Sequence, residues 1–334
     1  RFLFVNRDAL SYSPEVNKSS NRYNRNLGAE FNLASVNNIW TGKMMFLKSF
    51  TPGKNTDDFI YASDIKYNKA NFFWQWQHEY SGKNYMADVG YVPNAIRMGY
   101  YKINPTVGYL FFIKSAQIIS HGPKLISNFY WDKKFDLSDR EVTLSYHVNF
   151  INRATITANY TNNYVRLLRP FDPTNLGTTT LATGTEHNWN SAGIEIVSGP
   201  QNRLTYTVAG IFGGYYENGT RTNLRTELGY RFQPYVALSA AGNYNNIQLR
   251  EPWGRTQLWL FGPKVDITFR NNLFLTTYMQ YNNQAENVNL NARLQWRYKP
   301  ASDLYIVYTD NYLPDNFMVK NRALVLKFTY WWNL

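Results

Sequence analysis

The end of the chain alternates between apolar and polar positions. Leu324, Leu326, Phe328, Tyr330 and Trp332 fall on one parity, whereas the opposite parity includes a lysine and a threonine. Because successive side chains of a strand point to opposite faces, this stretch is predicted to be a strand with one apolar face that ends in aromatic rings. Such a face is typical of the closing strand of an outer-membrane barrel, although an amphipathic edge strand of a soluble sheet fits this stretch equally well.

Segments with the same alternation recur along the whole chain. Each has roughly ten residues and is bounded by turn residues, which is the pattern of barrel strands. No stretch shows the 3.6-residue periodicity of a helical domain. We predict about 18 strands, near residues 2–5, 23–34, 39–50, 58–68, 70–80, 102–113, 117–131, 139–150, 153–165, 187–198, 203–216, 221–232, 235–248, 256–269, 272–282, 288–299, 303–312 and 321–332.

The predicted connections alternate strictly between a short and a usually longer set. Short connections lie at residues 35–38, 68–70, 114–116, 151–153, 199–203, 232–235, 270–272 and 299–303. The other set lies at residues 6–22, 51–57, 81–101, 132–139, 166–186, 217–220, 249–255, 283–287 and 313–320. Short periplasmic turns and long external loops characterise outer-membrane barrels, whereas soluble sandwiches mix both lengths at both ends. This topology predicts a bacterial outer-membrane location with a periplasmic C-terminus.

The composition agrees with a barrel. Charged residues make up 17% of the chain and aromatic residues also 17%, whereas a soluble domain usually carries about 25% charged residues. No run approaches the roughly 18 apolar residues of a transmembrane helix. The net charge of +12 comes from scattered basic residues, so we predict no nucleic-acid partner. We therefore predict an all-β fold: one antiparallel transmembrane β-barrel domain of the outer-membrane type, covering residues 1–334.

Charged side chains recur on the parity opposite the apolar face. Opposite charges two residues apart on one strand, as at Arg225 and Glu227 or Lys264 and Asp266, suit pairing within the barrel. A slight basic excess would instead bias an open pore toward anions. The sequence leaves both interpretations open. The lumen candidates are Glu79, Glu141, His147, Arg225, Glu227, Arg231, Lys264, Asp266, Arg293, Arg297 and Lys327.

The four histidines do not predict a catalytic site. His78 and Glu79 are adjacent on a strand and therefore point to opposite faces. His147 faces the predicted lumen with Ser145 two residues away, but position alone does not make a catalytic triad. The chain has no cysteine and none of the common nucleotide-binding or zinc-binding motifs. We predict a protein that is not an enzyme, without a metal site or cofactor.

The first segment is too short to cross a membrane. Five residues extend over about 18 Å at most, and the hydrocarbon band of a barrel is about 25 Å tall. Unpaired backbone groups in hydrocarbon cost several kcal/mol each. We therefore expect further strands upstream, another chain, or a covered gap to complete the barrel, and we favour upstream strands.

Three phrases resemble a known family. They are N-R-Y-N-R-N-L-G-A-E-F-N-L at 21–33, L-Q-W-R-Y-K-P-A-S-D-L-Y-I-V-Y at 294–308 and K-N-R-A-L-V-L-K-F-T-Y at 320–330. They are similar to the C-terminal barrel of a Bacteroidota outer-membrane family with a domain of unknown function (5916-like). The resemblance implies that the chain supplies later strands of a longer barrel. The family's N-terminal carbohydrate-binding-like domain is absent here, and the family has no secure biochemical function.

Two functions remain open at this stage. We expect first a non-enzymatic subunit, anchor or scaffold of an outer-membrane assembly. The alternative is an outer-membrane channel or transporter for a small solute or glycan. The expected partners are outer-membrane lipid and lipopolysaccharide, whose phosphates basic loop residues such as Arg22, Lys83 and Arg250 would meet, and other outer-membrane or periplasmic proteins.

Overall fold

A computed structural model describes residues 1–88, 97–177 and 179–332, so parts of the predicted 81–101 and 166–186 connections lie outside the described residues. The described residues form one antiparallel sheet of 19 strands. The short 3-10 helices η1 (Ser19–Asn21) and η3 (Tyr216–Asn218) lie in connections. No helix in these ranges is both long and apolar enough to cross a membrane.

The strands follow one another in space in the order of the chain. They are β1 (Phe2–Asp8), β2 (Tyr23–Ala34), β3 (Trp40–Phe50), β4 (Phe59–Lys69), β5 (Phe72–Ser81), β6 (Tyr100–Tyr109), β7 (Phe111–Phe112), β8 (Ile118–Trp131), β9 (Leu137–Phe150), β10 (Thr155–Arg166), β11 (Glu186–Val197), β12 (Leu204–Gly214), β13 (Thr220–Phe232), β14 (Val236–Gln248), β15 (Arg255–Arg270), β16 (Leu273–Asn282), β17 (Asn287–Lys299), β18 (Ser302–Tyr312) and β19 (Val319–Phe328).

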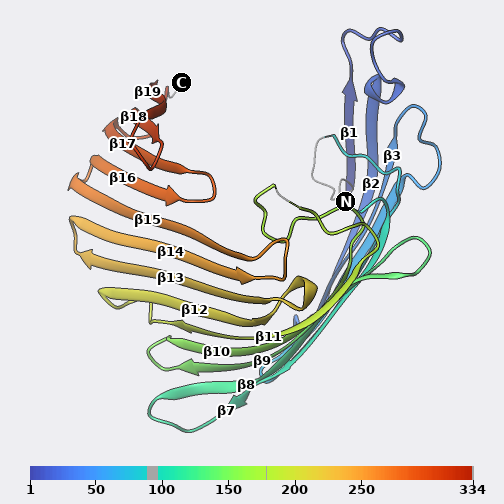
Figure 1. The fold of residues 1–334 in the computed structure, drawn as a ribbon, viewed down its shortest axis with the longest axis horizontal. Coiled ribbons are helices and arrows are strands. Elements are labelled where there is room, and N and C mark those ends of the chain that lie inside the picture. Colours follow the sequence, from blue (N-terminus) through green and yellow to red (C-terminus); the bar gives the residue numbers. More distant parts are fainter. Residues whose placement is uncertain (89–96, 178, 333–334) are drawn as a thin grey trace.

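The sheet bends strongly, so that it has a convex and a concave face. Figure 1 shows it as an open curve with β1 at one end and β19 at the other. β1 pairs with β2, and β19 pairs with β18. Within the described ranges, no residue pairing joins β1 to β19. The fold is an antiparallel transmembrane barrel sheet of the outer-membrane type that is left open between these two strands.

Strand register separates the apolar and polar residues between the two faces. Leu294, Ile306 and Leu326 are register partners on β17, β18 and β19 and share one face. Their neighbours Arg293 and Lys327 point to the other face, because side chains alternate along each strand. Large apolar side chains remain exposed along the first face, among them Leu224, Leu228, Leu324, Leu326 and Phe328. A face of this kind is suited to lipid rather than water.

The predicted strand pattern is confirmed, with three corrections, and the second set of connections is usually the longer one, although the β11–β12 connection (198–203) is longer than the β12–β13 connection (215–219). Strand β1 extends to Asp8 rather than ending at residue 5, because Asp8 still pairs with Tyr23. The predicted strand 102–113 divides into β6 and β7. At the break, the Tyr109 carbonyl comes very close to Gly122: a Cβ atom on residue 122 would lie 1.8 Å from the Tyr109 carbonyl oxygen. The Leu110 amide donates to the Asn71 carbonyl instead of pairing with β8.

The third correction concerns the end of the chain. β19 ends at Phe328, so Tyr330 and Trp332 lie beyond the strand. The physical reason is the partner strand: β18 begins at Ser302, and just beyond β19 the Thr329 amide donates to the Asp303 carbonyl at 2.9 Å. An apolar face that continues past the partner strand cannot continue as sheet.

Candidate functional site

All eleven lumen candidates lie on one face of the sheet. Register links them from strand to strand, for example Glu79 to Lys102, Asp266 to Ala237, and Lys327 to Tyr305. This is the face opposite Leu324, Leu326 and Phe328. The face therefore agrees with the sequence analysis, and the lumen role itself stays a prediction. The residues on this face are Glu79, Glu141, His147, Arg225, Glu227, Arg231, Lys264, Asp266, Arg293, Arg297 and Lys327.

The polar face is the concave one, because residues 82–88, which follow β5, lie across it. The Asn24 side chain donates to the Met86 carbonyl at 3.0 Å, and the Met86 amide donates to Ser49 Oγ at 3.2 Å. Arg7 Nε of β1 donates to Asp88 Oδ2 at 2.9 Å. A segment that leaves β5 and reaches the same face of β3, β2 and β1 must span the curve from inside. Asn24 and Ser49 are buried beneath it.

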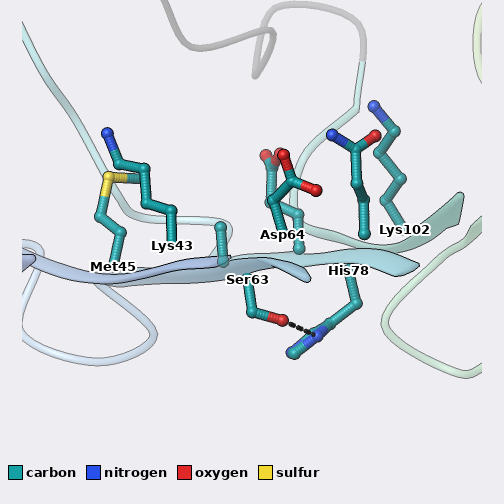
Figure 2. A pocket seen from close by; sticks show the side chains of 9 residues that line it. Lys43, Met45, Ser63, Asp64, His78 and Lys102 are labelled. Atoms are coloured by element: carbon teal, nitrogen blue, oxygen red, sulfur yellow. Dashed lines mark hydrogen bonds between the residues drawn. The ribbon is translucent and has the colours of Figure 1, made fainter. Parts of the chain in front are cut away.

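The first hollow on the concave face lies over β3 to β6. It has a volume of about 160 Å³ and is lined by Lys43, Asp64, Glu79 and Lys102. Figure 2 shows Lys43, Asp64 and Lys102 on one side of the sheet. Lys43 Nζ lies 2.6 Å from a Glu30 oxygen, and Lys66 Nζ lies 3.0 Å from Asp64. Acidic and basic groups thus alternate along this wall.

The second hollow lies over β12 to β15 and brings together Glu227, Arg231 and Lys264 within about 590 Å³. Arg225 lies 3.6 Å from Glu227, and Lys264 lies 2.7 Å from Asp266, so the predicted pairs form within their strands. Arg231 has a different task. Its guanidinium donates to the carbonyls of Pro200 and Asn202 and thereby fastens the β11–β12 turn.

His147 is held by hydroxyl groups rather than placed for catalysis. Its Nδ1 lies 2.9 Å from Thr157 Oγ1, and its Nε2 lies 3.2 Å from Ser145 Oγ. The Ser145 hydroxyl donates its one proton to the Lys124 carbonyl at 3.1 Å. Because that proton is already in use, His147 does not activate Ser145 as a nucleophile. Within the described residues, no group of three His, Asp or Glu side chains is placed to hold a metal ion.

A cluster at the long-loop rim joins three connections. Asp57 accepts hydrogen bonds from the Tyr80 hydroxyl, from the Lys83 amide at 3.0 Å and from Lys133 Nζ at 2.9 Å. Burial raises the pKa of Asp57, but these bonds outweigh burial and hold it below its ordinary value of 3.8. Burial lowers the pKa of Lys133, and the bonds to Tyr80 and Asp57 raise it above its ordinary 10.5. This rim cluster was not visible in the sequence.

The convex face carries a serine–histidine pair that the sequence analysis missed. Ser63 Oγ lies 2.7 Å from His78 Nδ1, and Figure 2 shows both on the opposite side of the sheet from Asp64 and Lys102. A signal existed, because a tight turn joins β4 and β5. Pairing Lys69 with Phe72 across that turn places Ser63 opposite His78.

A second polar group on the convex face lies at the long-loop end of the last hairpin. The Asp310 side chain is fully buried. Its Oδ2 accepts bonds from the hydroxyls of Tyr308 and Tyr312, both at 2.6 Å, and from Arg322 Nε at 2.8 Å. Two tyrosine rings and an arginine of the next strand thus enclose the carboxylate.

The chain is similar to known proteins only in the overall fold of solved structures, at low sequence identity. No protein-family model and no curated protein matches the chain. The siderophore receptor PirA from Pseudomonas aeruginosa is 10% identical, with 97% of this chain and 71% of that chain covered at a TM-score of 0.47. The ferric-catecholate import receptor Fiu from E. coli K12 is 7% identical, with 91% and 65% covered at 0.46.

A mutant of the ferric enterobactin receptor PfeA from Pseudomonas aeruginosa is 7% identical, with 87% of this chain and 65% of that chain covered at a TM-score of 0.42. The chain thus spans about two thirds of the length of these receptors. Scores of this size carry no argument about function. The fold rests on the strand pairing described above.

Proposed function

We propose that the chain is the membrane-spanning wall of an outer-membrane channel or transporter whose polar concave face passes a small hydrophilic solute. The observation that supports this most is the charged concave wall, where ion pairs line the sheet and hollows of about 160 and 590 Å³ remain. Barrels of about 8 strands are filled by their own side chains, whereas those of about 16 or more leave an aqueous channel. A sheet of 19 strands belongs to the wide class.

This proposal prefers the channel or transporter, which was the alternative in the sequence analysis, to the subunit, anchor or scaffold that we expected first. A scaffold acts through its outer wall and rims and has no need of a charged, hollow interior. The outer membrane as location, a periplasmic C-terminus and the long loops outside belong to the same proposal, as do contacts with lipopolysaccharide and with other envelope proteins. The 5916-like family also stays a proposal.

The experiment is conductance of the purified full-length protein in a planar bilayer. We expect ion conductance with a weak preference for anions, measured as the reversal potential in a salt gradient. Lys264→Glu, on the concave face, should move the reversal potential toward the cation value. His121→Phe, on the convex face, is the matched control and should leave it unchanged. Inserted, folded protein without conductance contradicts the proposal, and so does a Lys264→Glu variant with unchanged selectivity.

A further inference from the structure

The Ser63–His78 pair is a polar group on a face that is otherwise suited to lipid. Both residues share the face of Tyr61 and Trp76 by register. An ionisable side chain at membrane depth is costly, and it is retained where it has a partner or a function. Ser63 supplies one partner, on Nδ1 at 2.7 Å. Within the described part of the chain, His78 Nε2 has no hydrogen-bond partner.

Either tautomer of His78 leaves one donor of the pair unused. If Ser63 donates to Nδ1, the proton on Nε2 is free. If Nδ1 donates to Ser63 Oγ, the serine proton is free. Acyl chains offer no acceptor for this proton, so an unmet donor in hydrocarbon is destabilising. The carbonyl oxygen of an acyl ester is the acceptor that a lipid brings to this depth.

The surroundings of the pair supply a groove for a lipid. A groove of about 400 Å³ opens beside His78, walled by Tyr61, Trp76, Ile103 and Trp131 among others. The Tyr61 ring lies 5.4 Å from the His78 ring in an edge-on arrangement. Its lining also includes Glu79 and Lys102, whose side chains point to the concave face by register, so on the convex side the groove is walled mainly by aromatic and apolar side chains, with His78 as a hydrogen-bonding group.

The groups above and below the pair follow the profile of a lipid. Tyr80, two residues nearer the rim, lies 4.8 Å from the Tyr101 ring, and Phe135 stacks on Tyr101 at 4.3 Å. Above them lies the charged rim pair of Asp57 and Lys133, at 2.9 Å. From the rim inward, the order is charged groups, a level of rings that includes Tyr61, Tyr101 and Trp131 of the groove, the Ser63–His78 pair, and then Ile65 and Trp76. Amphipathic rings prefer the headgroup level of a membrane.

Acyl transfer is not the chemistry that this pair favours. The backbone amides around Ser63 and His78 lie in the ladder between β4 and β5, so they are not available as an oxyanion hole. Within the described residues, no carboxylate orients the His78 ring through Nε2. A nucleophile–base pair without these two supports lacks most of the catalytic machinery. Binding is the function that the contacts support.

We infer that Ser63 and His78, with the adjoining aromatic groove, form a binding site for an ester-linked acyl lipid. The ester carbonyl accepts the free proton of the pair, the glycerol side of the lipid lies against the rings of the groove toward the rim, and the acyl chain runs past Trp76 toward the membrane interior. The inference depends on the membrane-facing convex wall and not on solute passage through the concave side. A protein without conductance would leave it standing.

The test compares diester with diether phosphatidylglycerol, which differ in the carbonyl acceptor. Lipid retained by the full-length protein is measured by native mass spectrometry after detergent extraction. We expect diester lipid to bind about two- to tenfold more tightly, the effect of one neutral hydrogen bond. The double variant Ser63→Ala/His78→Phe, which removes both donors of the pair, should abolish this preference. Trp76→Ala should weaken the binding of both lipids equally.

His121→Phe is the matched control. His121 Nδ1 bonds the Tyr146 hydroxyl at 2.6 Å on the same convex face, but at the short-turn end. This variant should keep the ester preference. Equal binding of diester and diether lipid by the unaltered protein would overturn the inference. A folded Ser63→Ala/His78→Phe double variant that keeps the preference would overturn it as well.

Discussion

The two arms of the sheet are built from the same alternating strands but differ at their long-loop ends. In the arm from β2 to β9, the connections contact one another and the concave face, and Tyr85 and Tyr100 are only 3% exposed. In the arm from β12 to β19, the loops are short, and the Lys264–Asp266 pair is 42% and 39% exposed. Strand parity therefore decides which face a residue is on, whereas the loops decide whether it meets water.

The largest effect on stability is expected when a charge is placed on the apolar convex face of the arm from β12 to β19. Leu326→Arg places a charge on the convex face of β19 and should lower the stability of the barrel in lipid by about 2–4 kcal/mol. Lys327→Gln, its neighbour on the concave face, should cost much less. Urea titration of the protein folded into vesicles measures both. Equal losses would show that the two faces are assigned wrongly.

The next largest loss of stability is expected in the arm from β2 to β9, where the connections contact one another and the concave face. Asp57→Ala removes the acceptor of Tyr80, of the Lys83 amide and of Lys133. We expect a loss of about 1–3 kcal/mol, because the donors left behind are partly buried. The 82–88 segment should become accessible to protease at the same time. If protease access stays unchanged, the rim cluster does not hold the loops together.

Acid should destabilise the arm from β2 to β9 through the Asp57 carboxylate. The folded pKa of Asp57 lies below its ordinary 3.8, so its ionised form stabilises the fold above that pH. This contribution disappears as the pH falls through the folded pKa. The urea midpoint should therefore drop on acidification from about pH 5 to about pH 3. Asp57→Asn, which cannot titrate, should show a smaller drop, and an equal drop would assign the acid effect to other groups.

The smallest loss of stability is expected for an exposed ion pair on the concave face of the arm from β12 to β19. Asp266→Ala breaks the ion pair with Lys264, but both side chains are well exposed to solvent. Exposed pairs contribute at most about 1 kcal/mol. Its urea midpoint should stay close to that of the unaltered protein, well above that of Asp57→Ala. A larger loss than in Asp57→Ala would reverse the contrast between the arms.

The sequence predicts local geometry well because one rule controls it. Period-two alternation assigned faces to residues as distant as Glu79 and Lys327, and strand register places both on one face. The tight turn between β4 and β5 would also have yielded the contact of Ser63 with His78. The strand end at Phe328 needed the partner strand, since Tyr330 and Trp332 continue the same pattern.

Contacts made by loops could not be predicted in this way. Arg7 and Asp88 are separated by 81 positions, and Asp57 and Lys133 by 76. Nothing periodic connects such residues, and each pair depends on how a long connection folds over the sheet. Solvent exposure of the wall depends on these contacts. The lumen role of the polar face is for this reason a proposal, although the face itself is fixed.

The enclosed Asp310 carboxylate has a consequence for how the last hairpin reaches its place. It lies at the long-loop end, which in the proposed orientation is the end that must travel through the bilayer. Asp310 and Arg322 stand on neighbouring strands, with Arg322 Nη2 2.7 Å from the carboxylate. If β18 and β19 pair before they cross, the two opposite charges move together, and their fields largely cancel in a medium of low dielectric constant. If the two strands crossed one after the other instead, each would carry an unpaired charge through the hydrocarbon core.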